Sequence, residues 1–211
     1  MVTTLFYIHD PMCSWCYAFD SSLTALQKEL PDFIRIKKLA GGLAPDTTKP
    51  MPDALQKIIQ QTWRRIEQTV PTVKFNYDFW IINIPVRSTY PACRAVLAAR
   101  QQRTGFEDKM ISAIQTAYYQ KAKNPSHRST LLECALEAGL DGDRFAKDLN
   151  SDEIEQEFQH EISKARSLGV ISYPSLRLEH NGGIFPVSVD YLDHETMVNE
   201  ILGILGACPR T

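Results

Sequence analysis

The chain has 211 residues, of which 44% are hydrophobic and 23% are charged, and its formal net charge is −2. This composition is ordinary for a globular protein, and the length suffices for one large domain or for a compact domain with an insertion. The small net charge offers no electrostatic basis for binding nucleic acid or an anionic membrane surface, and no stretch approaches 18 uninterrupted apolar residues. We therefore expect neither nucleic acid nor a membrane as a partner.

The N-terminal region predicts a strand, a helix and a second strand. Residues 4–8 are almost continuously apolar, which is typical of a buried strand. Apolar residues then recur at helical spacing between residues 19 and 30, and Pro31 ends this pattern. A second strand is predicted over residues 33–39. Two strands joined by a helix over so short a span predict a parallel βαβ unit.

The middle of the chain is predicted to be mainly helical. Residues 44–52 contain three prolines and read as a loop. The residues from Thr130 to Glu133 fit a capping box, which predicts that a helix opens there. Further helices are predicted at 53–70, 92–103, 106–121, 143–149 and 152–168.

Strand signals return near the C-terminus. Residues 175–179 alternate between apolar and polar, and residues 181–183 (Asn-Gly-Gly) are a hairpin turn signal. The returning strand over 184–187 contains Pro186, which indicates an edge strand. A last amphipathic helix closes at Gly206. The sheet is therefore expected to combine both ends of the chain around a helical insertion.

Two cysteines, Cys13 and Cys16, stand where the first strand gives way to the first helix. Cys13 is expected in the first helical turn, where unpaired N–H groups and the helix dipole favour negative charge. A thiolate is the species that attacks disulfides. Cys16 follows three residues later on the same face, close enough to form a disulfide with Cys13. We expect the Cys13 sulfur to be exposed to incoming peptides.

Two other interpretations of the cysteine pair are half of a zinc site and two unrelated buried thiols. A structural zinc site takes about four ligands, and Cys93, Cys134 and Cys208 form no second pair, so no metal is expected. Cys93 and Cys134 are expected to behave as small buried apolar residues, and Cys208 as a free thiol. The pattern favours redox chemistry.

Residues next to the motif have weaker signals. His9 is expected to be a strand-end histidine satisfied by a hydrogen bond, and Asp10 a turn residue before Pro11. The odd number of cysteines and a first strand that begins almost at Met1 favour a reducing, cytoplasmic location.

The segment 10–17 (Asp-Pro-Met-Cys-Ser-Trp-Cys-Tyr) resembles the active-site segment of cytoplasmic FrnE-type proteins, in the DsbA-like branch of the thioredoxin superfamily. The segment 87–95 also resembles disulfide isomerases of that branch. The resemblance implies an α/β thioredoxin fold (β-α-β … β-β-α) with a large all-helical insertion. It implies a thioredoxin-like domain over residues 1–45 and 170–211 and a helical insertion domain over residues 46–169.

The resemblance also implies a cis-proline, Pro174, in the strand that faces the cysteine motif. The backbone of Tyr173 would then pair with an extended substrate. Ser14 and Trp15 separate the cysteines, where DsbA proteins have Pro-His and thioredoxin has Gly-Pro. Both are expected at the substrate site, with Trp15 either covering the substrate or packing on the insertion.

The implied activity is thiol–disulfide exchange on protein, peptide or small-thiol disulfides. Cys13 would be the nucleophile, and Cys16 would resolve the mixed disulfide. A reducing compartment favours a reductase or isomerase, with glutathione or a thioredoxin system as electron donor. No cofactor is implied beyond glutathione as a co-substrate.

Two other functions stay open. Kappa-class glutathione transferases and 2-hydroxychromene-2-carboxylate isomerases are similar in layout but have serine at the position of Cys13, so the cysteine pair favours redox chemistry. A non-catalytic peptide-binding chaperone would use an aromatic cluster formed by Phe75, Tyr77, Phe79 and Trp80 as its surface. This cluster is expected instead to lie in the core between insertion helices.

Overall fold

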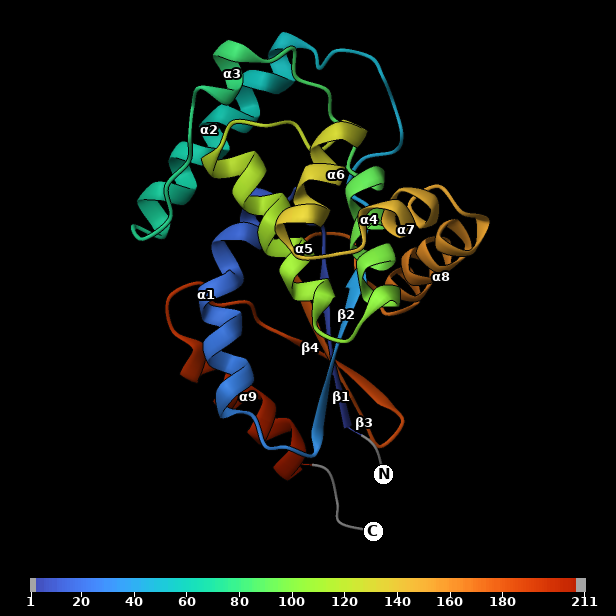
Figure 1. Ribbon diagram of the computed structural model, residues 1–211. Coiled ribbons are helices and arrows are strands. Elements are labelled where there is room, and N and C mark those ends of the chain that lie inside the picture. The colour runs from blue at the N-terminus through green and yellow to red at the C-terminus, as the bar shows by residue number, and fades with distance from the viewer. Residues whose placement is uncertain (1–2, 208–211) are drawn as a thin grey trace.

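The computed structural model describes residues 3–207, which contain one four-stranded sheet in the order β2-β1-β3-β4 (Figure 1). The strands are β1 (Thr3–His9), β2 (Ile34–Ala40), β3 (Ser175–His180) and β4 (Gly183–Val187). β2 runs parallel to β1, while β3 is antiparallel to both β1 and β4. The parallel pair follows from the crossover through α1 (Ser14–Glu29), as the sequence predicted.

The β3–β4 hairpin also matches the prediction. Asn181 and Gly182 both have positive φ, at 50° and 78°, as a tight hairpin turn requires. Pro186 lies on β4, which is an edge strand and therefore tolerates a residue without a backbone N–H.

Alternate residues of β1 face two different helical layers, which explains why this strand is apolar on both sides. Leu5 and Tyr7 pack with α1 and α9 (His194–Ala207), the two helices that lie together beside the sheet in Figure 1. Phe6 and Ile8 pack with Ala165 of α8 (Asp152–Ser167) on the opposite face. Burial on both faces removes the alternation that marks a half-exposed strand.

A block of helices stands between β2 and β3 in the chain, so the predicted order of elements is confirmed. The division into a thioredoxin-like domain (residues 1–45 and 170–211) and a helical insertion domain (residues 46–169) stays a prediction. Within the predicted insertion, α8, the last helix before β3, packs against the sheet. Before α8, the block consists of α2 (Asp53–Thr69), α3 (Phe79–Ile82), α4 (Tyr90–Gln102), α5 (Phe106–Gln115), a π-helical turn (Thr116–Gln120), α6 (Arg128–Glu137) and α7 (Gly142–Asp148).

The predicted capping box at the start of α6 is wrong. The helix begins at Arg128, so Thr130 is a buried residue of its first turn and does not cap it. The turn before the helix explains the earlier start, because the side chain of Asn124 accepts a hydrogen bond from the Ser126 N–H at 3.0 Å. The carbonyl of Asn124 accepts another from the His127 N–H.

The aromatic cluster lies in the core of the helical block. Its rings surround Trp63 of α2, with centroid distances of 4.7 Å to Phe75, 5.7 Å to Tyr77, 6.1 Å to Phe79 and 5.0 Å to Trp80. Trp63 itself is fully buried. The core interpretation is confirmed, and the cluster is not an exposed chaperone surface.

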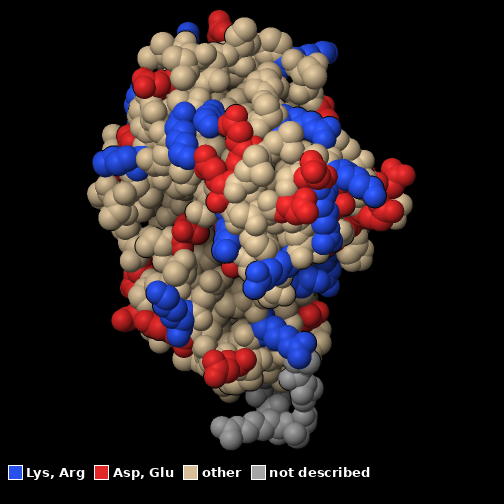
Figure 2. Space-filling view, viewed as in Figure 1, with Lys and Arg blue, Asp and Glu red and all other residues tan. Residues whose placement is uncertain are grey.

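Within residues 3–207, no helix is both long and apolar enough to cross a membrane. Basic and acidic side chains are interspersed on the face shown in Figure 2. Cys134 is buried within α6, as expected, and Cys208 lies outside the described residues.

Candidate functional site

Cys13 lies at the junction between β1 and α1. It directly precedes Ser14, the first helical residue, so it is the N-cap and not a member of the first turn. Its backbone N–H donates to the Asp10 carbonyl at 3.0 Å, and its thiol donates to the Tyr173 carbonyl at 3.6 Å. The Tyr173–Pro174 peptide is cis. The structure thus brings together the cysteine motif and the Tyr173–Pro174 segment that the sequence analysis singled out.

The Cys13 sulfur is less open than expected. Cys13 is 7% exposed and Cys16 is 1% exposed, and neither forms a disulfide. Cys13 as a residue is therefore more buried than the expectation of a sulfur exposed to incoming peptides suggested. Cys13 instead lines a pocket of about 400 Å³ together with Ser14, Trp15 and Tyr173.

The two cysteines are in different electrostatic surroundings. Burial raises the pKa of the Cys16 thiol well above its ordinary value, and its hydrogen bond with Cys13 raises it further. Cys13, by contrast, is next to the unpaired N–H groups at the start of α1. Burial therefore favours a proton on the inner sulfur, while the outer cysteine stands at the helix N-terminus.

Trp15 packs on the insertion, one of the two roles that the sequence left open, and its contact with a substrate stays a prediction. Its ring packs 4.9 Å from the ring of Tyr191, and the guanidinium of Arg65 lies 5.7 Å from its centroid. Trp15 also lines the Cys13 pocket, as Ser14 does. Both residues are half-buried and are therefore accessible to a molecule in the pocket.

Tyr173 is held against the end of β2. Its hydroxyl donates to the Gly41 carbonyl at 2.6 Å. A Cβ atom on Gly41 would lie 2.1 Å from the Tyr173 ring, so only glycine fits at this position. Burial raises the pKa of Tyr173 to about 12, so its hydroxyl stays a donor at neutral pH. The ring therefore forms a fixed wall of the pocket.

Asp10 is the residue whose role the sequence analysis missed. It is fully buried, and one carboxylate oxygen accepts from the Met12 N–H at 2.8 Å. The other oxygen accepts from the Leu43 N–H at 2.7 Å, the Thr89 hydroxyl at 2.6 Å and the Cys93 thiol at 3.5 Å. Asp10 is therefore more than a turn residue: it joins the cysteine loop to the segments after β2 and before α4.

Cys93 and His9 also differ from the expectations. The Cys93 thiol donates to Asp10, so it is a polar partner and not only a small apolar residue; burial raises its pKa well above the ordinary value. The His9 ring stacks on Tyr7 with centroids 5.0 Å apart. Burial lowers the pKa of His9 to about 3, so the ring is neutral near pH 7.

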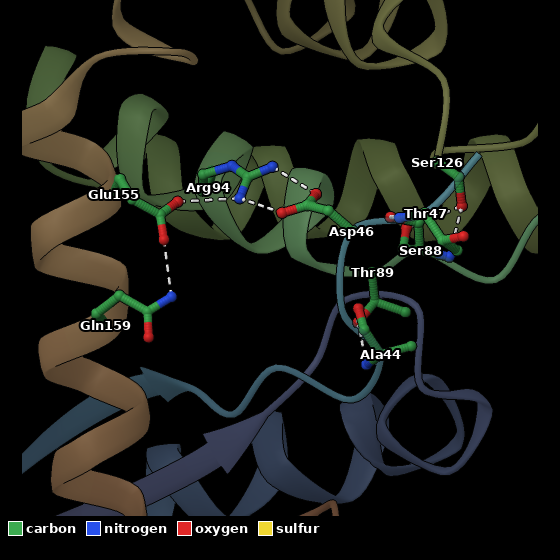
Figure 3. A network of polar contacts seen from close by, with 9 residues as sticks. All are labelled: Ala44, Asp46, Thr47, Ser88, Thr89, Arg94, Ser126, Glu155 and Gln159. Atoms are coloured by element: carbon green, nitrogen blue, oxygen red, sulfur yellow. Dashed lines mark hydrogen bonds and ion pairs between the residues drawn. The ribbon is translucent and has the colours of Figure 1, made fainter.

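Side-chain hydrogen bonds join the loop after β2 to the segment that contains the pocket residues Arg87 and Thr89, and Figure 3 shows this network of polar contacts. The Thr89 hydroxyl accepts from the Ala44 N–H at 3.0 Å, and the Ser88 hydroxyl accepts from the Thr47 N–H at 3.2 Å. The Ser126 hydroxyl lies 2.8 Å from the Ser88 carbonyl. These bonds hold the loop after β2 and the chain before α4 in one arrangement.

No group of three or more His, Cys, Asp or Glu side chains within residues 3–207 is placed to hold a metal ion.

Comparison with known proteins places this arrangement in a family. The family model described as "Thioredoxin" matches residues 6–182. This chain belongs to the thioredoxin family. The expected DsbA-like resemblance and the α/β thioredoxin-like fold with a large helical insertion (α2–α8) are confirmed.

Solved structures support the fold of this thioredoxin-family protein. It is similar to a "putative protein disulfide isomerase" from Nitrosomonas europaea, with 24% identity, a TM-score of 0.86 and coverage of 99% of this chain and 100% of the other. It is also similar to the cytosolic disulfide reductase DsbM from Pseudomonas aeruginosa, with 25% identity, a TM-score of 0.77 and coverage of 97% and 100%. DsbM has also been solved with GSH, and that structure gives 23% identity, a TM-score of 0.74 and coverage of 96% and 99%.

Among curated proteins, the chain resembles "ClpXP adapter protein SpxH". The SpxH of Halalkalibacterium halodurans is 24% identical over 170 residues, which are 79% of this chain and 55% of that protein. The SpxH of Bacillus subtilis is 24% identical over 200 residues, or 92% of this chain and 66% of that protein. The chain thus spans only part of the length of these relatives.

Proposed function

We propose that this thioredoxin-family protein is a thiol–disulfide oxidoreductase, a reductase or isomerase that acts on protein or small-thiol disulfides. One observation carries the proposal: Cys13 lines a pocket at the N-terminus of α1, with the protonated thiol of Cys16 buried behind it. A nucleophilic outer sulfur and a buried inner one are what two-step disulfide exchange requires.

In the first step, the Cys13 thiolate attacks one sulfur of a substrate disulfide. The substrate S–S bond breaks, a Cys13–substrate disulfide forms, and the other substrate sulfur leaves as a thiolate that takes up a proton. Tyr173, Pro174, Ser14 and Trp15 would contact the substrate, since Cys13 is hydrogen-bonded to Tyr173 and shares its pocket with Ser14 and Trp15.

In the second step, Cys16 loses its proton and attacks the Cys13 sulfur. A Cys13–Cys16 disulfide forms, and the second substrate sulfur leaves and is protonated. The substrate has gained two electrons and the protein has lost them, so turnover requires an external thiol reductant. We assign the role of reductant to glutathione or a thioredoxin system, which the structure of DsbM with GSH supports. We also assign the protein to the cytoplasm, which its similarity to the cytosolic reductase DsbM supports.

Insulin reduction tests this function. Cys13→Ala is expected to abolish activity, and Cys16→Ala to accumulate a Cys13 mixed disulfide visible by mass spectrometry. Cys134→Ala, a buried cysteine of α6 remote from the pocket lining, serves as the matched control and is expected to stay active. Full activity of Cys13→Ala would overturn the proposal.

A second candidate function is a non-catalytic protein adapter, which the name of the SpxH relatives favours. An adapter or a peptide-binding chaperone would still bind its protein partner after both Cys13 and Cys16 are replaced by serine. An exchange enzyme would lose all turnover in the same variant.

The glutathione-dependent transferase or isomerase remains a third candidate. It would turn over a chromene-type substrate with glutathione in Cys16→Ala, because that chemistry needs no resolving thiol. If Cys16→Ala still forms the Cys13 mixed disulfide but does not turn over the chromene-type substrate, the transferase or isomerase function is excluded and the exchange function stands.

A further inference from the structure

Among the described residues that line the Cys13 pocket, Arg87 has the single charged side chain. The walls around it are largely apolar and include Ile58, Ile59 and Trp63, and no acidic side chain of the described chain contributes to the lining. Within residues 3–207, the Arg87 guanidinium forms neither an ion pair nor a hydrogen bond. The pocket therefore presents one positive charge that no carboxylate of the described residues pairs with directly, although the buried Asp10 carboxylate lies behind the lining residue Thr89.

The backbone on both sides of Arg87 is fixed. The Ser126 hydroxyl lies 3.0 Å from the carbonyl oxygen of Val86 and 2.8 Å from that of Ser88. The Ser88 N–H in turn donates to the Ser126 hydroxyl at 3.2 Å, and Figure 3 shows these two serines facing each other. Because this backbone is already ordered, Arg87 can bind a ligand without the entropy cost of fixing its loop.

A hydrogen-bond donor accompanies the guanidinium. Tyr118 lines the same pocket, and it is 5% exposed. Burial raises the pKa of its hydroxyl, the positive charge of Arg87 acts in the opposite direction, and the negative charge of Asp10 adds to the rise. A protonated phenol and a guanidinium that line one pocket both offer hydrogen-bond donors to a carboxylate.

We propose that Arg87 binds a carboxylate of a small anionic thiol peptide of the glutathione type, whose sulfur then lies at Cys13. The proposal rests on the thiol–disulfide function and adds the residue that selects its small-molecule partner. A volume of about 400 Å³ is within the usual range for small-ligand sites. Arginine is the side chain best matched to a carboxylate, because its planar fork forms two parallel hydrogen bonds.

The redox step with glutathione disulfide balances without another reagent. The Cys13 thiolate attacks one sulfur, the glutathione S–S bond breaks, and a protein–glutathione disulfide forms. The second glutathione leaves as a thiolate and takes up a proton. Arg87 stays bound to the carboxylate and exchanges no electrons.

The first test measures binding without chemistry. The probe is S-methylglutathione, which keeps the carboxylates and has no reactive thiol, and its affinity is measured by titration calorimetry on the full chain. Arg87→Gln is expected to weaken binding about tenfold or more, and Arg87→Lys by less, since a charged hydrogen bond is lost or altered. As a control, Arg103→Gln removes the same charge from an exposed position at the C-terminal end of α4, and it is expected to leave the affinity for S-methylglutathione unchanged.

The second test compares two disulfides of different charge. With glutathione disulfide, the rate of Cys13 mixed-disulfide formation is expected to fall about tenfold in Arg87→Gln. With the neutral hydroxyethyl disulfide, the rate is expected to match the wild type. Equal slowing with both disulfides would make Arg87 a structural residue and overturn the proposal, as would S-methylglutathione affinity equal in wild type and Arg87→Gln.

The two tests also separate this inference from the proposed function. Binding that depends on Arg87 in a protein that reacts with neither disulfide would overturn the exchange activity and leave the carboxylate site standing. Reaction with both disulfides at rates that do not depend on Arg87 would overturn the carboxylate site alone.

Discussion

The carboxylate of Asp10 lies 2.6 Å from the hydroxyl of Thr89, a residue 79 positions away in the sequence. Asp10 directly follows β1 and precedes the cysteine motif, while Thr89 precedes α4 of the helical block. This hydrogen bond therefore connects the loop that carries Cys13 to the wall that carries Arg87. The helical insertion helps to position the candidate site and does more than cover it.

Replacement of Asp10 is expected to change how stability depends on pH. Burial raises the folded-state pKa of Asp10 above its ordinary value of 3.8. The folded state therefore keeps this proton to higher pH than the unfolded chain does. The resulting stability is fully present below about pH 3.8 and is lost as the pH rises through the folded-state pKa.

Asp10→Asn removes this titration while nearly preserving the shape of the side chain. Relative to the wild type, its free energy of unfolding should rise by up to about 1.4 kcal/mol per pH unit above pH 3.8, on top of a constant loss from the altered hydrogen bonds. Urea unfolding between pH 3 and pH 7 measures the difference. A difference that does not depend on pH would contradict the prediction.

Asp190 provides a control of opposite sign. Hydrogen bonds from the Asp193 and Leu192 N–H groups, at 2.8 and 2.9 Å, lower the pKa of Asp190. Its contribution to stability is present above the unfolded-state pKa and is lost as the pH falls through the folded-state pKa. Asp190→Asn should therefore differ most from the wild type at neutral pH, with the opposite slope to Asp10→Asn.

Gly41→Ala is expected to displace Tyr173. The added Cβ would lie 2.1 Å from the Tyr173 ring, so the ring has to move away from the Gly41 carbonyl to which its hydroxyl donates. We expect a loss of about 1–3 kcal/mol in the free energy of unfolding and slower disulfide exchange. Gly203→Ala in α9, where a Cβ meets nothing within 4 Å, should instead be neutral or stabilising. Equal unfolding free energies and exchange rates in the two variants would contradict the prediction, because they would show that the Tyr173 ring moves aside at no cost.

The thiols are expected to differ in alkylation rate. At pH 8, iodoacetamide should modify Cys13 first, because Cys13 lines the pocket at the start of α1. Burial raises the pKa of Cys16 and Cys93 well above the ordinary value and that of Cys134 to about 12, so all three should react slowly. Peptide mapping by mass spectrometry, on protein with Cys208 replaced by serine, gives the order. Modification of Cys16 as fast as Cys13 would contradict the asymmetry of the pair.

Truncation of Trp63 is expected to destabilise the helical block strongly. The ring is fully buried among the aromatic residues between α2 and α3, and it also lines the Cys13 pocket. Trp63→Ala should cost about 3–5 kcal/mol in thermal or urea unfolding, since the cavity cannot collapse completely. Ile81→Ala on α3, where the side chain is 79% exposed, should cost almost nothing. A small loss for Trp63→Ala would contradict the core role of the aromatic cluster.

Elements with strong local signals were predicted well. The strand–helix–strand unit, the hairpin turn at Asn181–Gly182 and the edge position of Pro186 all follow from short-range periodicity, turn chemistry or the missing N–H of proline. The start of α6 was misplaced because Thr130 satisfies a local capping pattern while the turn made by Asn124 opens the helix earlier. The short helix α3 was missed because one helical turn has no detectable periodicity.

The sequence by itself determined that two thiols would stand three residues apart at the start of an amphipathic helix, because that depends only on neighbouring residues. Only the tertiary structure decided that Asp10 would bond Thr89 and Cys93, that Arg87 would enter the Cys13 pocket, and that Cys13 would be largely buried. These relationships join segments separated by long stretches of chain. These long-range contacts form only when the whole helical block packs against the sheet, and no pattern among neighbouring residues predicts that packing.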